Sequence, residues 1–429
     1  MRSRRLIAKI DVIYNRVADG VLVLQPLFPA LLYLTVLTGS PPLLVSLIIN
    51  LTPLVVRYHR QKVLVKPTIF DLPILIFMIG SIVGLIVAPD KQTSMGALIS
   101  LFASVLVYYG ITSNGNRGKH YWITLGASII VISIVFAVWF FSQGQSRQYF
   151  FNQWAFDLFK SMPKIAGVSL GLNGIGLLFS SIIPVLLGSL LFDGTTTSRI
   201  WLASLVILLL SILFLSASTE GWIAFGISAF FAIVYWRKIA ALFLIPLSAV
   251  LTGLALFYYS STTWLQSSLD IQSILQRIDI WVKTIPLLSS FHSFLGLGLG
   301  NWAEVFNNFY YPGYTHMHNN YFQIYADMGV FGVISIFVGA VIFILTAHKI
   351  LQSTDKGILK GLTIGLIGSF LGGIFFNMLD VTLNGLIVSH NSYIYLSVPI
   401  FWVWAALYVV LFQRMFPQHP PNIGNLLKG

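Results

Sequence analysis

The residues best suited to chemistry gather in one short stretch, 315–321, which contains two histidines and two asparagines. His318 carries an imidazole, which titrates near pH ~6.5 and can therefore accept or hold a proton at working pH. Asn319 and Asn320 follow directly and are candidate substrate-binding residues. The stretch favours acid–base chemistry, and the alternative is a histidine that merely lies among aromatic side chains at a membrane boundary.

A metal site is not favoured at this stretch. His316 and His318 are two residues apart, a spacing that points their rings to different sides of a helix. The chain has no cysteine, no HExxH pattern and no Asp-x-Asp pair, so thiolate and paired carboxylate ligands are missing. The sequence therefore predicts a site that works without a metal.

Arg277 is the second candidate, because its planar guanidinium suits a bidentate grip on phosphate. It lies on a predicted helix, 268–288, whose apolar residues recur every three or four positions. Trp281, four residues along and on the same face, is a candidate substrate-binding residue, and stacking of the arginine on its ring is the alternative. Further positive charge comes from an earlier segment: Arg147, Lys160 and Lys164. Together these cations predict a patch that faces an anionic, lipid-linked substrate, with contacts to anionic lipid headgroups as the alternative.

Alternating glycines at 296–300 precede the histidines. The run resembles a phosphate-binding loop, but no βαβ unit surrounds it, so a dinucleotide-binding fold is excluded. Alternation of Gly with Leu favours a tight turn whose backbone amides approach a ligand or another helix. Gly298 and Gly300 are therefore candidate substrate-binding positions.

The composition indicates that the helices that position these residues lie in a lipid bilayer. Of the 429 residues, 57% are hydrophobic and 9% are charged, with mean hydropathy +0.85, whereas a soluble domain has about 25% charged residues. So few charges cannot cover a globular surface, so the chain is predicted to be an all-α polytopic membrane protein. The net charge of +12 does not indicate nucleic acid as a partner, because the cations lie in short loops between apolar runs.

Apolar runs of about 20 residues can span a bilayer, and they predict about twelve transmembrane helices in a single membrane domain, 1–429. The predicted spans are 20–38, 41–56, 70–88, 96–113, 121–142, 168–192, 200–215, 221–236, 239–259, 321–347, 361–379 and 386–411. With both termini in the cytoplasm, most of the 25 Lys and Arg residues fall in inner segments, as the positive-inside rule requires. The tail, 413–429, is then cytoplasmic.

Two outer segments, 143–167 and 260–320, are too long to be simple connections. The second is rich in aromatic residues, which disordered linkers lack. It therefore predicts a folded extracytoplasmic cap before the tenth helix, 321–347. Glu220 lies at the end of another span, and polar residues at such positions are functional candidates by default.

In combination, these residues resemble the O-antigen ligase and polymerase family of bacterial envelope glycosyltransferases. The matching elements are Leu172 to Pro184, Arg277, Trp281, Pro286, Gly296-x-Gly298-x-Gly300-Asn301, His318-Asn319-Asn320-Tyr321 and Asp327-x-Gly329-x-x-Gly332. The resemblance covers about 165–350, and the flanks match only in their topology.

The resemblance implies transfer of a glycan from undecaprenyl pyrophosphate at the outer face of the bacterial inner membrane, in polysaccharide or lipopolysaccharide synthesis. The acceptor is a hydroxyl of a sugar or of a lipid-anchored glycan, and no metal, nucleotide sugar or other cofactor is expected. His318 would assist the acceptor hydroxyl. Arg277 would hold the pyrophosphate and stabilise its growing charge.

One position departs from the family pattern. The family usually carries Ser-Arg followed by Gly and Trp at the outer end of a span, but here Thr219 stands in place of the arginine and Glu220 follows it. Cations of the segment 143–167 could replace it, or this member handles another substrate or has lost transferase activity. A secondary transporter of a small anion or solute is the alternative function, and a scaffold in an envelope polysaccharide system is a third.

Overall fold

The computed structural model describes residues 14–25, 43–114, 121, 124–126, 128, 172–192, 196–215, 218–237, 271–288, 294–310, 316–353, 357–379 and 400–416. These residues form helices and their connections, and none of them lies in a strand. The segment 143–167, with Arg147, Lys160 and Lys164, falls outside the described residues. So do the predicted span 239–259 and most of the spans 20–38 and 121–142.

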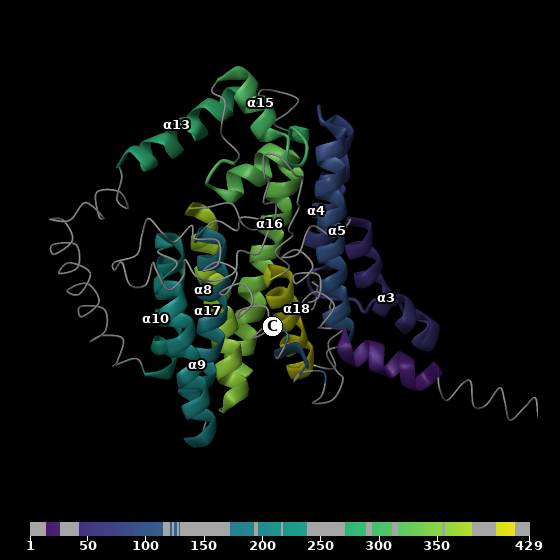
Figure 1. Cartoon of the computed structure of the whole chain (residues 1–429), viewed down its shortest axis with the longest axis vertical. Coiled ribbons are helices and arrows are strands. Elements are labelled where there is room, and N and C mark those ends of the chain that lie inside the picture. The colour runs from purple at the N-terminus through teal and green to yellow at the C-terminus, as the bar shows by residue number, and fades with distance from the viewer. Residues whose placement is uncertain are drawn as a thin grey trace, which may run out of the picture.

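Figure 1 labels the helices, which occur in the order α3 (Leu43–Gln61), α4 (Asp71–Val87), α5 (Lys91–Asn114), α8 (Leu172–Phe192), α9 (Thr196–Leu215), α10 (Thr219–Trp236), α13 (Ile271–Leu287), α15 (Trp302–Phe309), α16 (Asn320–Ser353), α17 (Ile358–Leu379) and α18 (Ile400–Met415). Three of them, α5, α16 and α17, contain stretches long and apolar enough to cross a membrane. The protein is therefore an all-helical membrane protein in its described part, and the count of twelve spans stays a prediction. Because α18 ends at Met415, the first residues of the predicted tail are helical.

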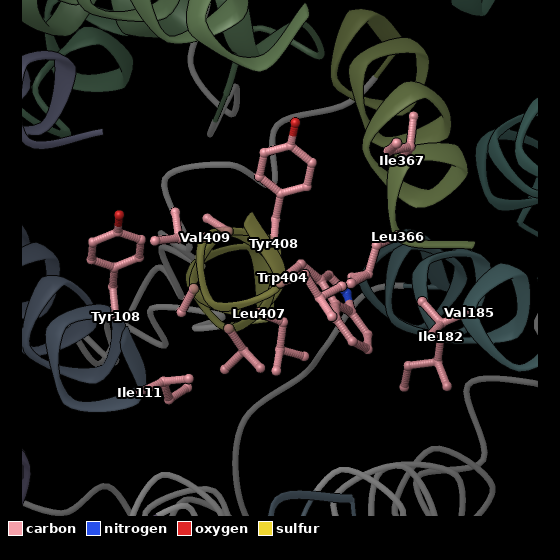
Figure 2. Packing of buried hydrophobic residues seen from close by; sticks show 14 of the residues in the cluster. Tyr108, Ile111, Ile182, Val185, Leu366, Ile367, Trp404, Leu407, Tyr408 and Val409 are labelled. Carbon is pink, nitrogen blue, oxygen red and sulfur yellow. The ribbon is translucent and has the colours of Figure 1, made fainter. Parts of the chain in front are cut away.

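The helices form two groups that meet at α16 and α18. On one side α17 packs against α8 and α10, and α9 packs against α8; on the other side α4 packs against α16, and α3 and α18 pack against α5 (Figure 1). Figure 2 shows the side chains of α18 between the groups, with Tyr108 of α5 on one flank and Leu366 of α17 on the other. The hydroxyl groups of Tyr408 and Thr346 lie 2.7 Å apart in this apolar core, so a buried hydrogen bond fastens α18 to α16.

Small residues set the distance between helices in the first group. A Cβ atom on Gly188 of α8 would lie 2.2 Å from the carbonyl oxygen of Gly361 on α17. Likewise, a Cβ atom on Gly221 of α10 would lie 2.7 Å from the Cα atom of Gly176 on α8. Helices in lipid associate through such close backbone contact, because lipid tails are as apolar as the helix faces they would otherwise cover.

The last helices of the cap, α13 and α15, lie beyond the N-terminal end of α16, at the top of Figure 1. The amphipathic pattern at 268–288 is confirmed as α13. A second apolar cluster joins α13, α15 and the start of α16, and its most buried members include Ile280, Trp302, Phe306, Met317 and Ala326. The cap therefore has a core of its own that rests on α16.

We predict that Gly188→Val lowers the thermal stability of the detergent-solubilised protein, because the added atoms must push α8 away from α17. Overpacking of this kind costs about 1–3 kcal/mol. The matched control is Gly226→Val on α10, where an added Cβ atom meets no atom within 4 Å. Melting followed by size-exclusion chromatography measures both, and equal midpoints for the two variants would contradict the close contact.

Candidate functional site

The site is built around a break in α16 at Gly329, whose φ of 59° and ψ of −143° are not helical. A Cβ atom at this position would lie 2.2 Å from the carbonyl oxygen of Phe294 and 2.7 Å from the amide nitrogen of Gly296. The break therefore admits the glycine run against the backbone of α16. Only glycine combines this positive φ with so close an approach.

The glycine run is hydrogen-bonded to α16 through its own backbone. Leu297 donates its amide to the carbonyl oxygen of Ala326 at 2.7 Å, and Gly298 donates to that of Asp327 at 3.1 Å. Positive φ values at Gly296, Gly298 and Gly300 turn these amides toward the helix. The sequence left open whether these amides approach a ligand or another helix. The amide of Gly298 bonds to another helix, α16.

Asn301 fixes the end of the run between α4 and α5. Its Oδ1 accepts the amide of Asp90 at 2.8 Å, and its Nδ2 donates to the hydroxyl of Ser94 at 2.7 Å. Asp90 in turn accepts the amide of Gln92 at 2.9 Å at the start of α5. Burial of Asn301 makes these bonds costly to lose. Its role was not foreseen from the sequence, although a polar residue directly after the glycines was the available signal.

A buried polar chain leads from the glycine run to the histidine loop. The carboxyl group of Asp327 is fully buried, and its Oδ1 accepts a hydrogen bond from Nε2 of Gln323 at 3.1 Å. Oε1 of Gln323 accepts the amide of Met317 at 3.2 Å. The residue before His318 is thus held by Gln323, which bonds to Asp327, and the carbonyl oxygen of Asp327 accepts the amide of Gly298 in the glycine run.

His318 lies at the N-terminal end of α16 with a left-handed backbone, at φ 51°. This conformation is uncommon for a residue with a side chain, and it points to a loop whose shape is set by its surroundings. The rings of His316 and His318 are 4.2 Å apart between centroids and tilted by 54°. The structure therefore brings together two imidazoles that an ideal helix would separate, because this loop is not helical.

Asn319 and Asn320 hold the loop to its neighbours. Oδ1 of Asn319 accepts the amides of Tyr321 and Phe322, at 3.0 and 3.1 Å, and so caps the first turn of α16. Nδ2 of Asn319 donates to the carbonyl oxygen of Met378 on α17 at 3.1 Å. Nδ2 of Asn320 donates to Oδ1 of Asn377 at 3.0 Å. These bonds give both asparagines a positioning role, and their contact with substrate stays a prediction.

Arg277 and Trp281 attach α13 to two different helices. The indole nitrogen of Trp281 donates to the carbonyl oxygen of Met317 at 2.8 Å, and its ring stacks on Phe322 at 5.5 Å. Nη2 of Arg277 lies 3.1 Å from Oε1 of Glu220 and forms an ion pair with it. The ring of Trp281 is therefore engaged with α16, and Arg277 reaches across to α10.

The run that departs from the family pattern is the first turn of α10. Ser218 is its N-cap and accepts the amide of Gly221 at 3.0 Å. Glu220 follows in the first turn, where a negative charge is favourable beside the helix N-terminus. Arg277 and Trp281 are four residues, about 6 Å, apart along α13, so the helix that forms the ion pair with α10 also contacts Met317, the residue before His318.

Titratable groups of the described residues do not assemble a metal site: no group of three or more His, Asp or Glu side chains lies close enough to hold an ion. Below the histidine loop the lining is apolar. Two cavities of about 180 and about 60 Å³ share Tyr321, Phe370, Ile374 and Phe401 in their walls. The hydroxyl of Tyr321 donates to the carbonyl oxygen of Ile374 at 3.1 Å between them. Charged and polar groups thus lie at the end of α16, with hydrophobic space beneath.

Fold and site together define a helical membrane protein with a histidine at the N-terminal end of α16 and an ion-paired arginine on the cap helix α13. Residues 204–337 match the family model of O-antigen ligase. The matched segment contains Glu220, Arg277, the glycine run and His318, so it spans the residues that the fold brings together. The match confirms the resemblance to the O-antigen ligase family. No curated protein matches the chain.

We predict that Gly329→Ala separates the glycine run from α16, because the new methyl group would overlap the backbone of Phe294. Strain at such a backbone position costs about 1–3 kcal/mol. Gly339→Ala in the same helix is the control, since its nearest neighbour would be 3.7 Å away. Limited proteolysis and thermal melting compare the two proteins, and a Gly329→Ala protein as stable as the control would disprove this account of the break.

Proposed function

We propose that this protein transfers a glycan from an undecaprenyl-pyrophosphate donor to the hydroxyl of a sugar or of a lipid-anchored acceptor. The observation that carries the proposal is the grouping of Arg277, the glycine run and His318 around one end of α16, within the segment that matches O-antigen ligase. This family works on lipid-linked glycans and their acceptors. A membrane-embedded site with polar groups above hydrophobic space suits such substrates.

His318 would act on the acceptor. A neutral imidazole can take the proton of the acceptor hydroxyl while that oxygen forms a bond to the anomeric carbon of the donor sugar. The bond between that carbon and the pyrophosphate oxygen breaks at the same time, and the pyrophosphate leaves with the electron pair. The loop is suited to this role because Met317, next to His318, is held through both its carbonyl oxygen and its amide.

Arg277 would hold the pyrophosphate and stabilise the charge that grows on it. A guanidinium has five N–H donors, so Glu220 and a phosphate can share it. Glu220 keeps Arg277 oriented, but its own charge repels the donor. Additional positive charge at the site would come from Arg147, Lys160 and Lys164, in place of the arginine that the family carries at the position of Thr219.

The proposal includes a location and an orientation. The protein would lie in the bacterial inner membrane as one membrane domain with both termini in the cytoplasm, and the cap 260–320 would face outward. There it would meet lipid-linked glycans that already carry their sugars. The apolar cavities that begin at Tyr321 offer space for hydrocarbon of the donor or the acceptor.

We expect His318→Ala to lower the rate of glycan transfer at least about 100-fold, the lower range for loss of a general base. Purified protein in proteoliposomes, supplied with the lipid-linked donor and an acceptor, gives the rate. His348→Ala, at an exposed position near the other end of α16, is the control and should keep the parental rate. Equal rates for the two variants would remove His318 from the reaction.

We expect Glu220→Gln to lower the KM for the donor about fivefold, the equivalent of roughly 1 kcal/mol for one charge pair. The amide oxygen can still accept the hydrogen bond from Arg277, while the repulsion of pyrophosphate is gone. Arg277→Lys should instead reduce kcat, because an ammonium group cannot replace the planar fork. A donor KM that stays the same in Glu220→Gln would show that its charge is not felt by the donor.

A deletion strain separates the two kinds of transfer. Gel analysis of its envelope glycans should show loss of all long glycan from the anchor lipid if the protein is a ligase. Loss of chain length with one repeat unit retained would indicate a polymerase. Unchanged glycans, together with solute uptake by proteoliposomes that lack a glycan donor, would favour a transporter and overturn the proposal.

A further inference from the structure

The cap helix α13 has an exposed apolar stripe in addition to the face that it buries. Leu275, Ile278, Val282 and Ile285 lie on the stripe with exposed fractions of 57%, 45%, 58% and 64%. The buried face is formed by Ile280 and Thr284 of the same helix and by Leu288 directly after its end. The regular apolar pattern therefore divides into two separate faces over residues 275–288, and within the described part of the chain only one of them is covered.

A third face of α13 is polar and consists of Gln276, Asp279 and Lys283. At about 100° per residue, the buried, polar and exposed apolar faces are centred roughly 120° apart. A helix at the edge of a soluble protein needs two environments, protein and water, and therefore two faces. Three faces of this composition fit three environments, of which the third is apolar.

The contacts of α13 place it at the ends of apolar helices. Arg277 is ion-paired to Glu220 in the first turn of α10, and Trp281 stacks on Phe322 in the first turn of α16. Phe322 is itself exposed, and so are Trp222 and Ile223 beside Glu220. The exposed apolar surface of the membrane helices thus continues to the level of α13. Aromatic side chains are typical of this boundary between hydrocarbon and headgroups.

We infer that α13 lies in the surface of the lipid leaflet on the side of the cap, with Leu275, Ile278, Val282 and Ile285 inserted between lipid chains. Gln276, Asp279 and Lys283 then face water, and the opposite face packs on the cap core. Lipid is the occupant that the stripe fits, because the stripe continues the apolar exterior of α10 and α16. This position also holds Arg277 near the depth of lipid phosphate groups.

The natural absence of cysteine allows a direct test in the full-length protein. Single cysteines replace Ile278, Val282, Gln276 or Asp279, are labelled with an environment-sensitive fluorophore, and are reconstituted into phosphatidylcholine–phosphatidylglycerol vesicles. Labels at positions 278 and 282 should emit at shorter wavelength and be quenched by lipids brominated on their acyl chains. Labels at positions 276 and 279 should be quenched by iodide in water. Ile280→Cys, on the buried face, is the reference for a label that is exposed neither to lipid nor to water.

Iodide quenching at positions 278 and 282 equal to that at 276 would overturn the inference, because the stripe would then lie in water. Protection from both quenchers, together with disulfide cross-links between copies, would also overturn it and show a second copy as the occupant. The measurement involves no glycan and no transfer rate. It therefore stands or falls separately from the proposed transferase activity.

Discussion

The site depends on the interruption of α16 at Gly329 and on the glycine run that fills it. Backbone amides at a membrane boundary must find partners within the protein when water is not available. Here two amides of the run 296–300, those of Leu297 and Gly298, bond to the carbonyl oxygens of Ala326 and Asp327. Replacement of the glycines by larger residues would keep the two backbones apart, so backbone contact sets the geometry of everything above it.

Buried hydrogen bonds connect this backbone contact to the loop that carries His318. Asp327 accepts the amide of Gly298 at its carbonyl oxygen and Nε2 of Gln323 at its carboxylate, and Gln323 accepts an amide of the loop that carries His318. Asn301 adds a connection to the start of α5. Hydrogen bonds between buried groups favour one arrangement of these segments over others. The loop that carries His318 is consequently bonded to α16 although the backbone of His318 is not helical.

The ion pair between Arg277 and Glu220 joins the cap to α10 and also alters the charge of the site. A chain with arginine at position 219 would present a cation in the turn where this chain presents a carboxylate. A carboxylate there gives the arginine a partner, and it would also offset part of the attraction for the anionic donor that we propose. Charge at the mouth of α16 is thus a local property of two residues far apart in the sequence, not of the net charge of +12.

The sequence by itself determined the membrane class, the helical pattern of α13, and the grouping of His318, Arg277 and the glycines into one signature. Hydrophobicity and periodicity are properties of neighbouring residues, so both can be recognised in the sequence alone. Only the tertiary structure decided that Glu220 pairs with Arg277, that the amide of Gly298 bonds to α16, and that Asn319 caps a helix. These contacts join α10, α13, α16 and α17, and their distances depend on packing between helices, which no local pattern contains.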